Sequence, residues 1–257
     1  MSDIKVKPER AAETVARHIE TLILEGSLAP DAALLPERDL AQRLNVSRPT
    51  LRDGLKLLEE RGLLTAEKGR GMRVAPLGKQ AIGDPLIALL SERPEVADDY
   101  LEFRDIVECQ AAAMAARRAS PIDLDRIRAC LDQIETAHIN AVPKDEAAAD
   151  ADLHLAIYEA SHNLVVLQIM RTLAGSLRND VAKNRGNMFT IPAIRELLRD
   201  QHLAIGQAIL ARDPQAAEDA AHAHLSYIRQ AAREFREAER QLDLSLRRLN
   251  GGGVGQR

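Results

Sequence analysis

Histidines and carboxylates at helical spacing give this chain a set of side chains that could bind a metal ion. Asp150 and His154 are four residues apart, so both lie on one face of any helix that contains them. Among the seven histidines, those on the apolar faces of helical patterns are His138, His154, His202 and His224. Three imidazoles and one carboxylate suit Zn²⁺, Ni²⁺, Mn²⁺ or Fe²⁺ and leave positions open for a ligand. Helical spacing alone does not select three of the four, and hydrogen-bonded core histidines are the alternative.

A second set of side chains, within residues 36–74, could bind nucleic acid. This segment has nine basic and six acidic residues, although the whole chain has a formal net charge of −4. Arginine offers a fork of donors that matches guanine O6 and N7, whereas hydroxyls and helix-start amides suit phosphates. A lone exposed arginine is usually only solvated, but here the set coincides with an ordered series of structural signals. The candidate DNA-contacting residues are Arg38, Ser47, Arg48, Thr50, Arg52, Lys68, Gly69 and Arg70.

A helix–turn–helix and a β-wing are needed to position these residues, and residues 8–76 predict both. Helices are expected over 8–26, 37–44 and 47–61, with Ser47 as the N-cap of the third. Two short strands follow, in LLTAE and MRVA, joined by the basic, glycine-rich tip KGRG. Gly54 lies inside the third helix, where it is expected to cost about 0.5–1 kcal/mol relative to alanine. This layout is typical of a winged helix domain, which inserts the start of its third helix into the major groove.

The histidines need a different framework, which the rest of the chain provides as a series of helices. After a linker at residues 77–83, helices are expected near 84–92, 95–119, 122–141, 144–161, 163–185, 192–211 and 214–243. Prolines lie at or just before most of these starts, where a missing N–H is harmless. The expected fold is therefore mainly α. It joins the winged helix–turn–helix to an antiparallel bundle of about seven helices over residues 84–243, followed by a flexible tail at 244–257.

Composition agrees with a mainly helical protein of the cytoplasm. Hydrophobic residues make up 46% of the chain and aromatic residues 2%, with no Trp, which favours helices over sheets. No apolar stretch reaches the length of a membrane span, and the N-terminus lacks the apolar segment of a signal peptide. Cys109 and Cys130 are far apart and form no CxxC pair, which argues against a disulfide scaffold or a thiolate zinc site.

Residues 8–76 resemble the N-terminal domain of GntR-family bacterial transcription regulators. The resemblance is carried by the stretch ILEGSLAPDAALLPERDLAQRLNVSRPTLRDGLKLLEERGLL. Its most specific parts are LPERDLA and VSRPTLRDGLKLLE. The resemblance implies that Arg38, Arg48, Arg52 and the wing glycines occupy DNA-contact positions. It also implies a homodimer that binds a pseudo-palindromic operator in double-stranded DNA.

The segments LEFRDIVECQAA and DLHLAIYEASHN resemble the FCD ligand-binding domain of the FadR subgroup of this family. Metal-binding members of that subgroup have ligands at matching spacing, which implies a divalent ion, Zn²⁺ first, at Asp150, His154, His202 and His224. Arg104 resembles an FCD arginine that faces the pocket, where it would hold a carboxylate together with the metal. The alternative for Arg104 is a surface ion pair with Asp105 or Glu108.

The chain also resembles the group that contains the pyruvate dehydrogenase complex repressor and lactate- and glycolate-responsive regulators. Stretches that carry this resemblance include GDPLIALLSERPEVADDYLEFRDIVE and EASHNLVVLQIMRTL. This resemblance implies a repressor of a carbon-metabolism operon that responds to a small 2-oxo or 2-hydroxy carboxylate. Pyruvate, lactate, glycolate and a dicarboxylate all remain open as effectors. One alternative is a DNA-binding protein with a purely structural metal. A metal-dependent enzyme is the other, and the lack of an HExxH motif or a glycine-rich phosphate loop argues against it.

Overall fold

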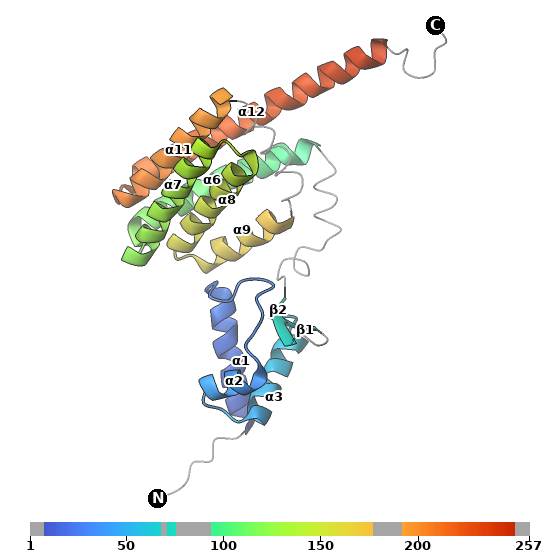
Figure 1. The fold of residues 1–257 in the computed structure, drawn as a ribbon, viewed down its shortest axis with the longest axis vertical. Coiled ribbons are helices and arrows are strands. Elements are labelled where there is room, and N and C mark those ends of the chain that lie inside the picture. The colour runs from blue at the N-terminus through green and yellow to red at the C-terminus, as the bar shows by residue number, and fades with distance from the viewer. Residues whose placement is uncertain (1–7, 68–70, 76–93, 177–191, 250–257) are drawn as a thin grey trace, which may run out of the picture. The chain divides into compact units, whose positions relative to one another are not determined.

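The computed structural model describes residues 8–67, 71–75, 94–176 and 192–249, which form two compact units (Figure 1). The N-terminal unit contains three helices and a two-stranded sheet, and the C-terminal unit is helical. The expected mainly α fold is therefore confirmed. None of the described helices combines the length and the apolar character needed to cross a membrane.

In the N-terminal unit, α1 (Pro8–Leu24), α2 (Glu37–Arg43) and α3 (Arg48–Glu60) enclose a small apolar core. The apolar faces expected from the sequence are buried, and Leu51 and Leu58 of α3 are inaccessible to solvent. The expected N-cap is also present, because the backbone N–H of Thr50 donates to Ser47 Oγ at 3.2 Å. This cap fixes where α3 begins and so which side chains lie in its first turns.

Gly54 of α3 permits close contact between α3 and α1. A Cβ atom at this position would lie 2.9 Å from the carbonyl oxygen of Ala12 and 2.9 Å from Cγ1 of Val15. Both distances are shorter than ordinary van der Waals contact, so any side chain here would push the two helices apart. The propensity cost expected from the sequence is therefore accompanied by a packing benefit that the sequence pattern did not indicate.

The expected wing is present as a two-stranded antiparallel sheet. The first residue of β1 (Leu64–Glu67) pairs with the last residue of β2 (Gly71–Val74), and the register continues to the tip. Gly71 begins β2 with φ +86°, a left-handed conformation that favours glycine. The expected contact residues of the tip lie outside the described residues: Lys68, Gly69 and Arg70.

The described helices that follow the wing in the chain are α6 (Pro94–Arg118), α7 (Pro121–Asn140), α8 (Pro143–Ala160), α9 (Leu164–Ser176), α11 (Pro192–Leu210) and α12 (Pro214–Leu249). Five of these six helices begin at a proline, as the sequence predicted. The links at residues 119–120 and 141–142 are very short, so α6, α7 and α8 turn back on one another as expected for antiparallel neighbours.

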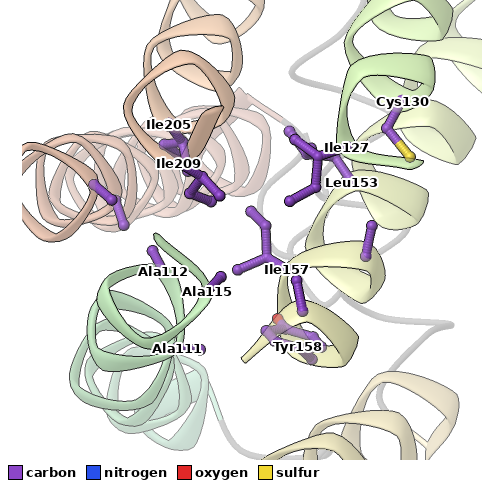
Figure 2. Packing of buried hydrophobic residues seen from close by; sticks show 14 of the residues in the cluster. Ala111, Ala112, Ala115, Ile127, Cys130, Leu153, Ile157, Tyr158, Ile205 and Ile209 are labelled. Carbon is purple, nitrogen blue, oxygen red and sulfur yellow. The ribbon is translucent and has the colours of Figure 1, made fainter. Parts of the chain in front are cut away.

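The core of the C-terminal unit lies where α6, α7, α8 and α11 converge. Figure 2 shows Ile157 of α8 pointing toward the alanines of α6 and the isoleucines of α11. Ala112 and Ala115 on α6 have at most 1% exposure, and Ile205 and Ile209 on α11 are equally buried. Small side chains on α6 let its backbone approach the neighbouring helices, and Arg104 and Glu108 on the same helix are buried as well.

The C-terminal boundary expected from the sequence is wrong. α12 does not end at residue 243 but continues to Leu249, so residues 244–249, expected in a flexible tail, are helical (Figure 1). The segment between these limits contains no Gly or Pro, and the first glycine of the GGG run is Gly251. Leucine and arginine are good helix formers, so nothing ends the helix earlier. Residues 250–257, the expected helix at 84–92 and the end of the expected helix at 163–185 lie outside the described residues.

Candidate metal centre and nucleic-acid interface

Three helices of the C-terminal unit bring four metal-ligating side chains into one buried cluster. α8 provides Asp150 and His154, α11 provides His202, and α12 provides His224. One ligand atom from each residue lies within 4.8 Å of the others, and none of the four residues is more than 6% exposed. The fold therefore brings together the four residues that the family resemblance implied. They are called the buried cluster below.

The distances within the buried cluster suit an ion at its centre. His202 Nε2 lies 2.8 Å from Asp150 Oδ1, and His154 Nε2 lies 3.7 Å from the same oxygen. The ring centroids of His202 and His224 are 4.4 Å apart. Metal–nitrogen and metal–oxygen bonds of about 2.0–2.2 Å require ligand atoms at this kind of separation. Within the described part of the chain, His154 Nε2 has no hydrogen-bond partner although it is buried, so it is free to act as a ligand.

Two further side chains orient the imidazoles of this cluster. His154 Nδ1 lies 2.7 Å from Glu108 Oε2, and His224 Nδ1 lies 3.1 Å from Gln201 Oε1. An acceptor at Nδ1 holds the proton on that nitrogen and leaves the Nε2 lone pair for a metal ion, as is usual around metal-bound histidines. Glu108 and Gln201 were not predicted as site residues. The only sequence signals were the i,i+4 spacing from Arg104 to Glu108 and the position of Gln201 next to His202.

The Arg104 side chain is buried and bonded to Glu108, and both residues are 3% exposed. The pairing anticipated as the alternative for Arg104 therefore exists, but it lies inside the protein rather than on the surface. Burial would raise the pKa of Glu108, but the charges of Arg104 and His154 outweigh it and hold the pKa well below its usual range. Burial opposes the charge on Arg104 as well, yet its pKa is raised because Glu108 is ionised. The pair is thus a buried ion pair in contact with the cluster.

The protonation tendencies of the histidines differ within the buried cluster. Burial, reinforced by the charges of His202 and His154, lowers the pKa of His224 well below its usual range. Burial also opposes a charge on His154, but the negative charge of Glu108, the neighbouring Asp150 carboxylate and the hydrogen bond between His154 and Glu108 raise the pKa of His154. A metal ion binds only the neutral imidazole, so it would displace the proton of His154 and would find His224 already neutral.

Two small cavities flank the buried cluster. One is lined by polar side chains beside Asp150 and His202, among them His138, Glu146, Arg195 and Arg199. The other lies beside His154 and His224 and is lined by Glu108, Tyr158 and apolar residues. Each has a volume of about 10 Å³, which is room for roughly one water molecule. A small organic acid could therefore enter only if neighbouring side chains moved.

The residues proposed to contact DNA lie on the exposed start of α3 and on α2. Arg48 and Arg52 are exposed, and the hydroxyls of Ser47 and Thr50 are 2.7 Å apart in the helix cap. Arg52 Nε donates to Glu37 Oε2 at 2.7 Å, which ties α3 to α2. Arg38 is also exposed and forms an ion pair only with its neighbour Asp39 in the described chain. Exposed ion pairs of this kind are weak, so they can open when a phosphate or a base competes.

A capped recognition helix with a β-wing, followed by a helical unit with a buried polar cluster, defines the class of two-domain bacterial transcription regulators. Residues 11–74 match the gntR family of bacterial regulatory proteins, and residues 99–227 match the FCD domain. The chain belongs to the gntR family and carries an FCD domain. Its family and relatives are transcription regulators and not enzymes.

Curated relatives match this chain along most of its length. A protein of Escherichia coli (strain K12) named "Putative L-lactate dehydrogenase operon regulatory protein" is 36% identical over 236 residues, with 90% of each chain covered. The Glc operon transcriptional activator of the same organism is 34% identical over 229 residues, which cover 87% of this chain and 90% of that protein. The expected similarity to lactate- and glycolate-responsive regulators is thus confirmed.

A solved structure has the same fold. A GntR protein of Streptococcus agalactiae aligns with a TM-score of 0.52 and 25% sequence identity, covering 85% of this chain and 99% of that one. The order of a winged helix–turn–helix unit followed by a helical unit is therefore that of a known regulator fold.

Proposed function

We propose that this chain is a homodimeric repressor of a carbon-metabolism operon. In this proposal, residues 8–76 bind a pseudo-palindromic operator in the cytoplasm, and residues 84–243 bind a divalent metal ion and a small 2-oxo or 2-hydroxy carboxylate, with residues 77–83 as linker. The observation that carries the proposal is the buried cluster of one carboxylate and three imidazoles in the FCD domain. Burial of a carboxylate and three imidazoles is costly unless they bind a partner, and a metal ion with its effector would be such a partner.

The donor set of the buried cluster favours Zn²⁺, with Ni²⁺, Mn²⁺ and Fe²⁺ as alternatives. Three nitrogens and one carboxylate oxygen suit these borderline ions, whereas Mg²⁺ and Ca²⁺ prefer oxygen ligands. Asp150, His154, His202 and His224 would hold the ion, with Glu108 and Gln201 orienting two of the imidazoles. When bound, such an ion supplies a Lewis acid to which a carboxylate effector can attach.

The effector would bind between the metal ion and Arg104. A 2-oxo or 2-hydroxy acid carries two adjacent oxygens, so it can bind the ion and still present its carboxylate to a guanidinium. Arg104 is engaged by Glu108 in this structure, so an incoming carboxylate must compete with that residue. The relatives whose names refer to the L-lactate dehydrogenase and Glc operons support L-lactate and glycolate as the first acids to test.

The small cavities beside the buried cluster connect effector binding to a change of conformation. Each has room for about one water molecule, so binding of an acid requires displacement of side chains on α6, α8, α11 or α12. The conformation with effector bound would therefore differ from the conformation without it. Regulation follows if these two states differ in affinity for the operator.

The DNA-binding part of the proposal assigns separate roles to the exposed residues. Arg48 and Arg52 would donate to base edges in the major groove, while Ser47, Thr50 and the first amides of α3 would contact phosphates. Arg38 would contact the backbone or a base from α2, and Lys68, Gly69 and Arg70 would reach the phosphates or the minor groove from the wing. Two copies, one on each half-site, give the symmetry that a pseudo-palindromic operator requires.

Thermal unfolding of the purified full chain tests the effector site. We expect Zn²⁺ together with L-lactate, glycolate, pyruvate or malonate to raise Tm, and a chelator to abolish that rise, because a ligand stabilises the state it binds. The substitution His224→Ala should remove the response. The matched control His18→Ala, at an exposed position on α1, should keep it. If neither metal nor any of the four acids changes Tm, the proposed site is wrong.

Operator binding then separates regulation from a structural metal. A duplex selected from a random-sequence library by the wild-type chain serves as the probe, and fluorescence anisotropy measures its affinity with and without the acid that raises Tm. Weaker DNA binding with the acid supports a repressor, whereas tighter binding would contradict that sign of regulation. Chelator-sensitive stability without any effect of the acids on DNA affinity would support the alternative, a structural metal.

A further inference from the structure

Three metal-ligating side chains outside the buried cluster meet between α6 and α12. Asp105 and Cys109 are one turn apart on α6, and His222 reaches them from α12. One ligand atom from each lies within 4.8 Å of the other two. The His222 side chain is 63% exposed and that of Asp105 is 22% exposed, whereas Cys109 is buried beneath them. We propose that Asp105, Cys109 and His222 form a second divalent-metal site, suited to Zn²⁺, on the solvent-facing side of these two helices.

The contacts within this outer cluster match the separations that a small ion requires. Cys109 Sγ lies 3.1 Å from Asp105 Oδ1, and His222 Nδ1 lies 2.9 Å from the same oxygen. Zn²⁺ bonds of about 2.0–2.3 Å to oxygen, nitrogen and sulfur keep tetrahedral ligands only slightly farther apart than this. Small rotations of the side chains would therefore admit an ion without a change in the helices. The exposed side of His222 leaves the fourth coordination position to water.

The protons that now occupy the outer cluster can be accounted for when an ion binds. Burial and the hydrogen bond to Asp105 raise the pKa of the Cys109 thiol, so the metal-free thiol is protonated and donates to Asp105. Binding of Zn²⁺ forms the metal–sulfur bond and releases this proton to solvent. A metal bond to His222 Nδ1 requires the imidazole proton to lie on Nε2, where Ser226 Oγ at 3.4 Å can accept it.

The donor set selects the class of ion. A thiolate and an imidazole disfavour Mg²⁺ and Ca²⁺, and the single carboxylate adds the negative charge that borderline divalent ions tolerate well. Glu218 on α12 places a further negative charge near Cys109 and accepts a hydrogen bond from Gln110 of α6. The surroundings are therefore favourable to a cation.

The outer cluster and the buried cluster share no residue, although α12 provides a histidine to each. Arg104 and Glu108 of α6 point inward, while the residues that follow each of them, Asp105 and Cys109, belong to the outer cluster. An ion at the outer cluster would clamp α6 to α12 without using any ligand of the buried cluster. The sequence argued against a thiolate zinc site because the cysteines form no CxxC pair. Asp105 lies four residues before Cys109 on α6, and helix packing provides the other partner, His222, from α12.

Co²⁺ titration of the full chain distinguishes the two clusters, because only the outer one contains sulfur. We expect near-ultraviolet thiolate-to-Co²⁺ charge-transfer absorption in the wild-type chain and its loss when Zn²⁺ is added. Asp150→Ala should keep the absorption, since it changes only the buried cluster. Cys109→Ser should abolish it, and His222→Ala should weaken Co²⁺ binding by about tenfold or more.

The second cysteine provides the matched control. Cys130 is buried on α7, so Cys130→Ala should retain the full absorption if the sulfur ligand is Cys109. His222 is largely exposed, so His222→Ala tests the site even if Cys109→Ser fails to fold. Absence of the absorption at millimolar Co²⁺, its persistence in Cys109→Ser, or its loss in Cys130→Ala would each overturn the proposal. None of these readouts depends on DNA or effector binding, so failure here and failure of the proposed function are distinguishable.

Discussion

Glu108 Oε2 lies 2.7 Å from His154 Nδ1, while Glu108 Oε1 accepts from Arg104 Nε. One buried carboxylate therefore both orients a candidate metal ligand and neutralises the candidate effector-binding arginine. The two functions proposed for the helical domain meet at this side chain. Any change at Glu108 should affect metal affinity and stability together.

Glu108→Gln is expected to lower the free energy of unfolding by about 3–5 kcal/mol, because it leaves the charge of Arg104 buried without a partner. It should also weaken Zn²⁺ binding by about 10–100-fold, since Gln is a weaker acceptor for His154 Nδ1–H. Urea denaturation and calorimetric titration measure the two effects. The control is Glu102→Gln, which removes an ion pair with Arg229. The Glu102 side chain is 56% exposed, so this substitution should change the free energy of unfolding by less than about 1 kcal/mol. Equal effects of the two substitutions would refute the role given to Glu108.

Most of the framework could be predicted from the sequence because local signals determine it. Prolines at 94, 121, 143, 192 and 214 each begin a helix, and Ser47 caps α3, as expected from their types and positions. Asp150 and His154 could be placed on one face because they share a helix. Adding His202 and His224 depended on the family resemblance, since His138 fits an apolar face equally well.

The remaining features depend on contacts between helices that are distant in sequence. Glu108 belongs to the site only because α6 packs against α8, and Gln201 only because α11 packs against α12. The small volume beside the cluster is likewise a property of packing, not of residue spacing. The expected end of α12 was wrong for a local reason. No Gly or Pro that would end a helix occurs between residue 243 and Gly251, so the helix continues to Leu249.

Gly54→Ala should destabilise the protein although alanine is the better helix former. The new methyl group would lie 2.9 Å from the Ala12 carbonyl oxygen and from Val15 Cγ1, so α1 and α3 must separate. Overpacking of this kind costs about 1–3 kcal/mol and exceeds the propensity gain of about 0.5–1 kcal/mol. Urea denaturation measures the balance. Gln42→Ala, at an exposed position on α2, is the control and should be nearly neutral. A stabilised Gly54→Ala variant would show that the helix contact is not close.

The stability of the helical domain should fall in acid partly through Asp98. Hydrogen bonds from Arg233 and then from Arg229 lower the pKa of this carboxyl below its ordinary value of 3.8. Because the folded-state pKa is the lower one, the stabilisation is fully present above pH 3.8 and is lost as the pH falls toward the folded-state value. Asp98→Asn should therefore lower Tm at pH 6. The difference in Tm between this variant and the wild type should shrink below pH 3.8. A difference that is constant from pH 6 to pH 2.5 would contradict this assignment.

Arg48→Ala should weaken binding to the selected operator more than a substitution at the other end of the same helix. Arg48 lies exposed in the first turn of α3, where a fork of donors can reach base edges. Loss of such a contact costs about 1–3 kcal/mol and relaxes the preference at one base pair. Arg61, at the C-terminal cap of α3, pairs with Glu20, so Arg61→Ala should have little effect on DNA affinity. Fluorescence anisotropy with the operator and with single-base variants measures affinity and preference. A uniform loss across all variants would assign Arg48 to a phosphate instead of a base.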